Sequence, residues 1–137
     1  MRISQKLDYA CRAAVCLAKH YDGSSVIKVE DIASQEAIPA SFLVQILNEL
    51  KRAELVQSRR GKAGGYLLAR PPAGITLADL VQALEPSLLE APSDPQGQSG
   101  ESLHGAWTKV SQSLTEQLRG ITLDSLAISS DSPMYFI

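Results

Sequence analysis

The chain has 137 residues, 45% of them hydrophobic, which supports one compact domain with an appended helix and argues against a multidomain protein. No apolar run approaches the ~20 residues of a membrane span, so the sequence predicts a soluble, cytoplasmic protein. The net charge of −2 hides an asymmetry, because residues 1–70 hold eleven Lys and Arg against seven Asp and Glu, whereas residues 71–137 hold two against eight. A basic first half and an acidic second half favour a DNA-binding protein with a separate oligomerisation or sensing element. The alternative is that the charges are distributed unevenly by chance.

The first predicted elements are two helices. An amphipathic helix is expected over residues 3–21, because apolar residues recur there in steps of three and four. The polar run over residues 22–25 ends it. A short helix is expected over Val29–Glu36, with Glu30 and Asp31 near the positive end of its dipole. Residues 37–40 then form a turn, so that a helix and a turn precede the next periodic segment.

The third predicted helix covers residues 41–53 and has two different faces. Its apolar face carries Phe42, Leu43, Ile46, Leu47 and Leu50, and its other side carries Ser41, Gln45, Asn48 and Arg52. Because this helix follows a helix and a turn, the polar stripe is the candidate recognition surface for DNA bases. The alternative for Gln45 and Asn48 is that they simply face solvent.

A β-hairpin with a basic tip should follow, from strands over Leu55–Ser58 and Tyr66–Ala69. The tip carries Arg59, Arg60 and Lys62, together with Gly61, Gly64 and Gly65, which permit positive φ angles and leave little bulk beside the backbone. Such a tip suits phosphates or a narrow minor groove. Residues 1–85 are therefore predicted to form a winged helix-turn-helix domain, mainly α with a small β-hairpin.

The last part of the chain should contain two further helices and a loop. Thr76 and Asp79 resemble a capping box that opens a helix with Leu77, Leu80 and Val81 inside. Residues 86–101 lose periodicity and are rich in Pro, Gly and Ser, which predicts a flexible loop where a sensor site could lie.

Residues 102–137 are predicted to form a long dimerisation helix and a tail. The candidate dimerisation residues are Leu103, Trp107, Val110, Leu114, Leu118 and Ile121, in a heptad-like pattern that Gln117 interrupts. Dimerisation would favour sequence-specific DNA binding, because a two-fold symmetric dimer contacts two half-sites of the DNA. The alternative is that this helix packs on the core of its own subunit.

These parts, in this order, resemble the Rrf-two family of bacterial winged-helix regulators over nearly the whole chain. The strings that carry the resemblance include Met1–Ser4, Asp31–Ala33, Ser41–Leu43, Gln45–Leu47, Leu50–Ala53, Gly64–Pro71 and Ile75–Asp79. The resemblance implies a homodimer that binds an imperfect palindrome, and we expect a transcription regulator that acts as a repressor, with an activator as the alternative. It also implies that helix 41–53 enters the major groove and that the wing reaches the adjacent minor groove.

Residue roles follow from the same resemblance and from side-chain chemistry. Gln45 matches a position that the family directs toward bases, and Arg60 matches the family's wing arginine. Several relatives have Glu where this chain has Val44, which implies a changed base preference. The cations expected to neutralise phosphates are Lys28, Lys51, Arg59 and Lys62. Ser41, Phe42, Asn48, Gly61, Gly64 and Gly65 complete the predicted DNA-binding set.

The cysteines bear on the sensing mechanism. Many relatives hold an iron–sulfur cluster through three cysteines in the loop before the long helix, whereas residues 86–101 here contain none and Glu101 stands where one would fall. Cys11 and Cys16 lie about 140° apart on the first helix, which is a poor arrangement for a shared metal, and one or both should pack as small apolar groups. We therefore expect neither a metal nor another cofactor. His104 would be the candidate ligand if a cluster were retained, and a thiol-based redox sensor stays an alternative.

Other classes of function are less well supported by the sequence. No pattern of nucleophile and base, and no phosphate-binding loop, predicts an enzyme. A winged-helix protein-interaction module that has lost DNA binding is the other alternative, but such a module has no use for Arg59, Arg60 and Lys62 at one exposed tip. The expected partners are double-stranded DNA, a second copy of the chain, and a small-molecule or protein effector, but not a membrane.

Overall fold

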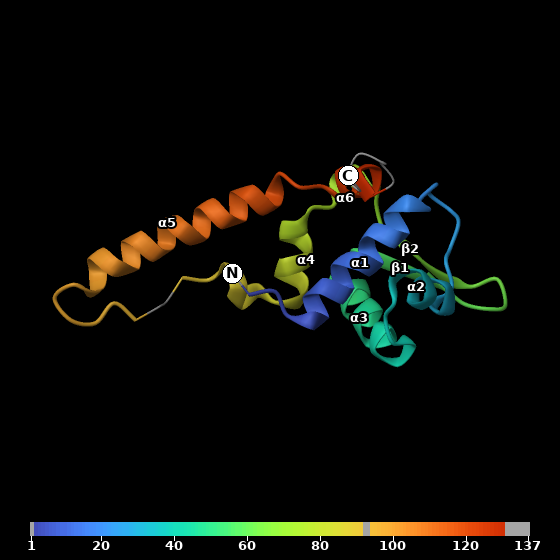
Figure 1. Ribbon diagram of the computed structural model, residues 1–137, viewed down its shortest axis with the longest axis horizontal. Helices are drawn as coiled ribbons and strands as arrows, with labels where there is room; N and C mark the ends of the chain where they lie inside the picture. Colours follow the sequence, from blue (N-terminus) through green and yellow to red (C-terminus); the bar gives the residue numbers. More distant parts are fainter. Residues whose placement is uncertain (1, 92–93, 131–137) are drawn as a thin grey trace.

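The computed structural model describes residues 2–91 and 94–130, which form a small helical body, a hairpin and one long helix that extends from the body (Figure 1). In chain order the elements are α1 (Gln5–Lys19), α2 (Val29–Glu36), α3 (Ala40–Arg52), β1 (Val56–Arg59), β2 (Gly65–Leu68), α4 (Leu77–Leu84), α5 (Gly100–Arg119) and α6 (Leu123–Ser130), with 3-10 turns at Pro72–Gly74 and Pro86–Leu89. The mainly α fold with a small hairpin is as predicted. No helix within these two ranges has the length and apolar character needed to cross a membrane.

Helix α1 forms the centre of the body. It begins at Ser4, whose Oγ accepts a hydrogen bond from the backbone N–H of Leu7 at 3.1 Å. Its buried side chains include three small ones, Ala10, Ala13 and Ala14, which are at most 1% exposed. Small side chains let neighbouring helices approach closely, and α1 contacts α2, α3, α4 and α6.

The helix-turn-helix unit is held to α1 at the turn. Ala37, at the end of α2, has a left-handed backbone with φ of 56°, and its N–H donates to Ala33 O. Arg12 Nη1 of α1 donates to the Glu36 carbonyl at 2.6 Å, which satisfies one of the unpaired carbonyls at this helix end. The angle between α2 and α3 is thus fixed by local backbone geometry and by α1.

The segment before α2 pairs with the outer edge of the hairpin, beside strand β2. Strands β1 and β2 are antiparallel, with Val56 opposite Leu68 and Arg59 opposite Gly65. Ile27 pairs with Tyr66 through two backbone hydrogen bonds, each 2.8 Å long. We call residues 56–68 the wing; its base is anchored by burial of Val56, Leu67 and Leu68.

The C-terminal part returns to the body in a way that the sequence analysis did not foresee. The Thr76–Asp79 capping box forms as predicted, and Arg70 Nη2 lies 3.2 Å from Asp79 Oδ2. A backbone bridge between Thr76 and Thr122 holds the end of α5 beside the start of α4. Helix α6 follows and buries Leu123 and Ala127 in the main core. Residues 131–137 of the expected tail lie outside the described residues.

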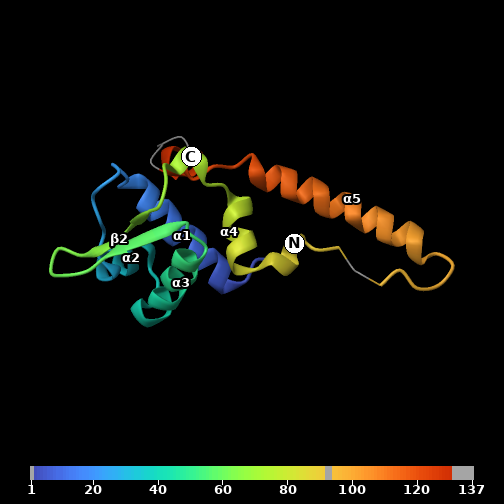
Figure 2. The ribbon, with the colours of Figure 1, turned by 180° about the vertical axis from the view of Figure 1, so that it is seen from behind.

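In the described part of the chain, α5 packs against α4 and the Pro86–Leu89 turn through its C-terminal half. Leu118 is buried with Leu7, Ala78 and Val81, and Leu114 packs beside them. The N-terminal half of α5 projects away from the body in both views (Figures 1 and 2). Its side chains Leu103, Trp107 and Val110 are each more than half exposed.

Candidate nucleic-acid interface

The outer face of α3 is open to solvent. Leu43, Ile46, Leu47 and Leu50 are fully buried, whereas Ser41, Gln45, Asn48 and Arg52 are exposed as predicted. The helix begins after Pro39 with no side-chain cap and no acidic residue in its first turn. Its first backbone N–H groups are therefore free of a capping side chain and can donate to an anion.

Two side chains from α1 support this face. Lys6 Nζ lies 2.8 Å from Glu49 Oε1, which neutralises a carboxylate at the edge of α3. The Tyr9 and Phe42 rings meet edge to face with centroids 5.6 Å apart. Phe42, which belongs to the predicted DNA-binding set, is half-buried and packs against the core. Its side chain thus anchors α3 to α1. The sequence analysis missed Lys6, because its partner is 43 residues away and no local pattern links them.

The tip of the wing is basic and tightly turned. Arg59, Arg60 and Lys62 are all exposed. Gly61 has φ of +100°, and the Gly64 N–H donates to Gly61 O at 3.0 Å, which closes the turn. A Cβ on Gly64 would lie 2.2 Å from Arg59 O, so no larger residue fits this turn unchanged.

Lys28, which the sequence analysis assigned to phosphates, lies beside this tip. It precedes α2 and lines, together with Arg59, Arg60 and Lys62, a surface hollow of about 600 Å³. Gly61, Gly64 and Gly65 line the same hollow, and Glu30 is its one acidic member. The fold therefore brings four cations from two distant segments around exposed glycine backbone.

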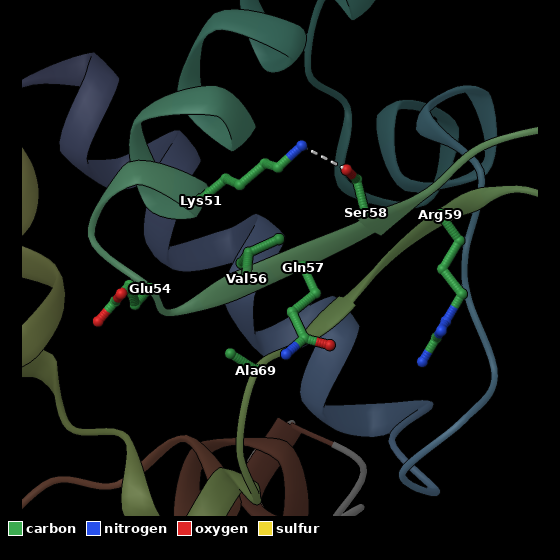
Figure 3. Close-up of a pocket in the computed structure, with 7 residues that line it drawn as sticks. All are labelled: Lys51, Glu54, Val56, Gln57, Ser58, Arg59 and Ala69. Atoms are coloured by element: carbon green, nitrogen blue, oxygen red, sulfur yellow. Dashed lines mark hydrogen bonds between the residues drawn. The ribbon is translucent and has the colours of Figure 1, made fainter.

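Lys51 connects α3 to the wing. Its Nζ donates to Ser58 Oγ of β1 at 2.7 Å, as the dashed line in Figure 3 shows. In this view Arg59 points away from the Lys51–Ser58 pair. Lys51, Ser58 and Arg59 all line a second hollow, of about 480 Å³. The bond gives Lys51 a structural contact in addition to its predicted role toward phosphates.

The residues that could hold an iron–sulfur cluster do not fit one. Such a cluster requires several thiolates, and the chain has two cysteines, both free and both in α1. Burial, with a smaller contribution from Asp8, raises the pKa of Cys11 to about 11. Burial, followed by the charge of Glu36, raises the pKa of Cys16 to about 11. In residues 2–91 and 94–130, no three His, Cys, Asp or Glu side chains come together as metal ligands, and His104 lies on α5 whereas both thiols lie on α1.

The predicted dimerisation residues divide into two groups. Leu103, Trp107 and Val110 are 57%, 51% and 56% exposed along one face of α5. Leu118, in contrast, is 8% exposed in the core of its own chain, with Leu114 half-buried beside it. Ile121 lies beyond the end of α5 and is half-buried. The projecting half of the helix thus carries the apolar surface that remains uncovered.

An apolar groove was not anticipated from the sequence. It measures about 510 Å³ and is formed where α1, α4, α5 and α6 meet. Its apolar lining residues are Ile3, Leu7, Cys11, Val15, Leu77, Val81, Leu118 and Leu126. Because these come from four elements spread over the chain, no single sequence pattern reveals the groove.

Comparison with known sequences gives one consistent family. The Rrf2 model, described as an iron-dependent transcriptional regulator, matches residues 3–128. A Mycobacterium tuberculosis protein named as an HTH-type transcriptional regulator is 38% identical over 132 residues, which are 93% of this chain and 81% of the relative. The HTH-type transcriptional regulator IscR of Vibrio cholerae is 30% identical over 135 residues, which are 96% of this chain and 78% of that protein.

Solved structures agree with these matches. CymR, the global cysteine regulator of B. subtilis, superposes with a TM-score of 0.82 at 28% identity, over 96% of this chain and 99% of that one. IscR of T. potens superposes with a TM-score of 0.75 at 33% identity, over 94% of this chain and 88% of that one. The chain therefore belongs to the Rrf2 family of transcriptional regulators.

Proposed function

We propose that this regulator binds a palindromic DNA operator sequence-specifically, as a homodimer and without an iron–sulfur cluster, and that it acts in the cytoplasm as a repressor. The observation that carries the proposal is the grouping of Lys28, Arg59, Arg60 and Lys62 around glycine backbone, next to a helix whose outer face is polar and exposed. A protein-only interaction module would gain nothing from this concentration of positive charge.

Each part of the surface has its own role in the proposed complex. Helix α3 enters the major groove, where the Gln45 amide can form two hydrogen bonds with adenine. Arg60 enters the adjacent minor groove, whose negative potential is strongest where the groove is narrow. Lys28, Arg59 and Lys62 neutralise phosphates, and the first backbone N–H groups of α3 donate to another. The phosphate contacts set affinity, and the two groove contacts set sequence preference.

A second copy of the chain completes the molecule. One recognition helix and one wing contact few bases, and a two-fold pair doubles the contacts. The apolar face of Leu103, Trp107 and Val110 supports α5 as the dimer helix, because these large side chains are otherwise left in water. In a two-fold dimer the same face of each copy is buried.

The proposed absence of a cluster rests on the chain's own donors. Cys11 and Cys16 are uncharged thiols at neutral pH, because burial raises both pKa values to about 11. This chemistry also weakens the redox-sensor alternative, since the thiolate is the reactive form. We propose that the input is a small molecule or a protein that acts through residues 86–101 and α5.

The test compares two cations of the wing. Arg60→Ala should weaken binding to the specific operator by roughly 1–3 kcal/mol, with a smaller effect on random DNA, because Arg60 reads the minor groove. Lys62→Ala should weaken binding to both DNAs alike and lower the salt dependence, because it neutralises a phosphate. Fluorescence anisotropy at two salt concentrations measures both effects.

Lys109→Ala is the matched control, because Lys109 is an exposed cation on α5 far from the wing in the chain. It should bind both DNAs like the unchanged protein. Equal losses for Arg60→Ala and Lys62→Ala on specific and random DNA would remove the base-reading role of Arg60.

A further inference from the structure

One large apolar side chain is exposed on the outer face of α3. In the described part of the chain, the exposed large hydrophobic side chains are Ile3, Val44, Leu103, Trp107, Val110 and Ile128. Ile3 lines the apolar groove, three others form the α5 face, and Ile128 lies on α6. Val44, at 38% exposure, is the member of this group that lies on the proposed recognition helix.

The position of Val44 on α3 is set by helical spacing. Val44 follows Ser41 by three residues and precedes Asn48 by four, so these exposed side chains lie along one strip. Lys51, seven residues after Val44, continues the strip and is hydrogen-bonded to Ser58 of the wing. Gln45 and Arg52 lie on the adjacent strip of α3, and together with Asn48 they line a hollow to which Val44 does not belong. Val44 therefore belongs to the wing side of the recognition surface.

The chemistry of Val44 restricts what it can recognise. A valine side chain has no hydrogen-bond donor or acceptor, so it binds neither a phosphate nor the polar edge of a base. The apolar group that a major groove offers is the 5-methyl group of thymine. Contact between this methyl group and the exposed valine methyl groups would remove both from water. The neighbouring amides Gln45 and Asn48 bring the helix close enough to base edges for such a contact.

We propose that Val44 reads a thymine of the operator through its 5-methyl group. This inference rests on the proposed function, because it presumes that α3 lies in the major groove. It adds a specificity-determining residue and names the chemical group that it recognises. A protein with a polar side chain at this position would not share the preference.

The test removes the methyl group from the DNA without changing its hydrogen bonds. Once an operator has been selected from random DNA, each thymine of one half-site is replaced in turn by deoxyuridine. Binding of the unchanged protein should weaken about fourfold at the contacted position, which corresponds to one methyl group buried. Val44→Ala should bind the thymine operator more weakly and lose its sensitivity to deoxyuridine at that position alone.

Asn48→Ala is the matched control, because it shortens a neighbouring side chain of the same strip. It should weaken operator binding but keep the deoxyuridine sensitivity. If the unchanged protein enriches a palindrome but no thymine shows a methyl effect that Val44→Ala abolishes, the inference is wrong and the proposed function stands. If the protein enriches no sequence at all, the proposed function fails and the inference fails with it.

Discussion

At the scale of single residues, the two thiols of α1 are held in their neutral form. Cys16 is fully buried and its Sγ lies 3.4 Å from Gln35 Oε1, while Cys11 lines the apolar groove. The pKa of each is raised from 9.0 to about 11, chiefly because burial disfavours the thiolate. Both side chains pack in or against the core, as was expected of one or both of them.

Alkylation of the native protein should therefore be slow at pH 7.5 and should accelerate as the pH rises from 9 to 11. Mass spectrometry after timed exposure to iodoacetamide measures this rate, with the protein unfolded in guanidinium as the reference. Rapid labelling of native protein at pH 7.5 would instead support a thiol-based sensor.

The same pKa shifts give the stability a pH dependence. The folded protein holds the two thiol protons more tightly than the unfolded chain does, which stabilises the fold. This contribution to the free energy of unfolding is complete below pH 9 and is lost as the pH rises through about 11. The free energy of unfolding, measured by urea titration, should fall over this window. The Cys16→Ala variant should show a smaller fall, and an unchanged pH dependence in this variant would contradict the assignment.

At the scale of elements, the wing depends on glycine at a point of close backbone approach. A Cβ on Gly65 would lie 2.5 Å from the carbonyl oxygen of Ile27, across the pairing of Ile27 with Tyr66. From its sequence, Gly65 was predicted to belong to the DNA-binding tip. The structure shows that it also lets the segment before α2 join the hairpin, which places Lys28 beside the wing cations.

Gly65→Ala should lower the free energy of unfolding by about 1–3 kcal/mol, the usual cost of forcing extra volume into a packed site. Operator binding should fall as well, because Lys28 and the wing separate. Urea denaturation and anisotropy measure the two effects. Gly105→Ala is the control: nothing lies within 4 Å of its added Cβ on α5, so it should be neutral or stabilising. Full stability of Gly65→Ala would contradict this account of the wing.

Elements with strong local patterns could be predicted from the sequence, and those defined by distant contacts could not. The second helix was placed at its observed bounds, and α3 was placed within one residue, because each has one apolar face. Helix α6 was not foreseen, since it has only eight residues and the exposed Ile128 lies off the face that Leu123, Leu126 and Ala127 share, which weakens its period. The capping box was found because it is a four-residue signal.

The candidate interface shows the same division. The polar stripe of α3 and the basic tip are local, and their exposure was predicted. The Lys6–Glu49 pair and the approach of Lys28 to the wing join residues far apart in the chain, and the Lys51–Ser58 bond joins a helix to a strand. Such contacts depend on how the elements pack, which a single sequence does not reveal.

At the scale of the whole molecule, α5 carries the exposed apolar face that is proposed to pair two copies of the chain. Trp107→Lys should convert the dimer to a monomer, because it places a charge in the middle of the proposed apolar interface. Sedimentation equilibrium at micromolar concentration measures the change, and circular dichroism should show that the helices are retained.

Gln112→Lys is the matched control, since it adds the same charge to the polar side of α5, among residues such as Thr108 and Arg119. It should remain dimeric. A dimeric Trp107→Lys variant, or a monomeric unchanged protein, would show that α5 does not pair the subunits in the proposed manner.

The most direct test of the central claim is selection of bound sequences from a random DNA pool by protein purified without oxygen. The account predicts that a colourless, iron-free sample enriches a palindrome whose half-sites are centred about one helical turn, or a multiple of one turn, apart. Enrichment of no sequence would contradict specific DNA binding. Enrichment only by protein that carries iron and sulfide would contradict the proposed independence from a cluster.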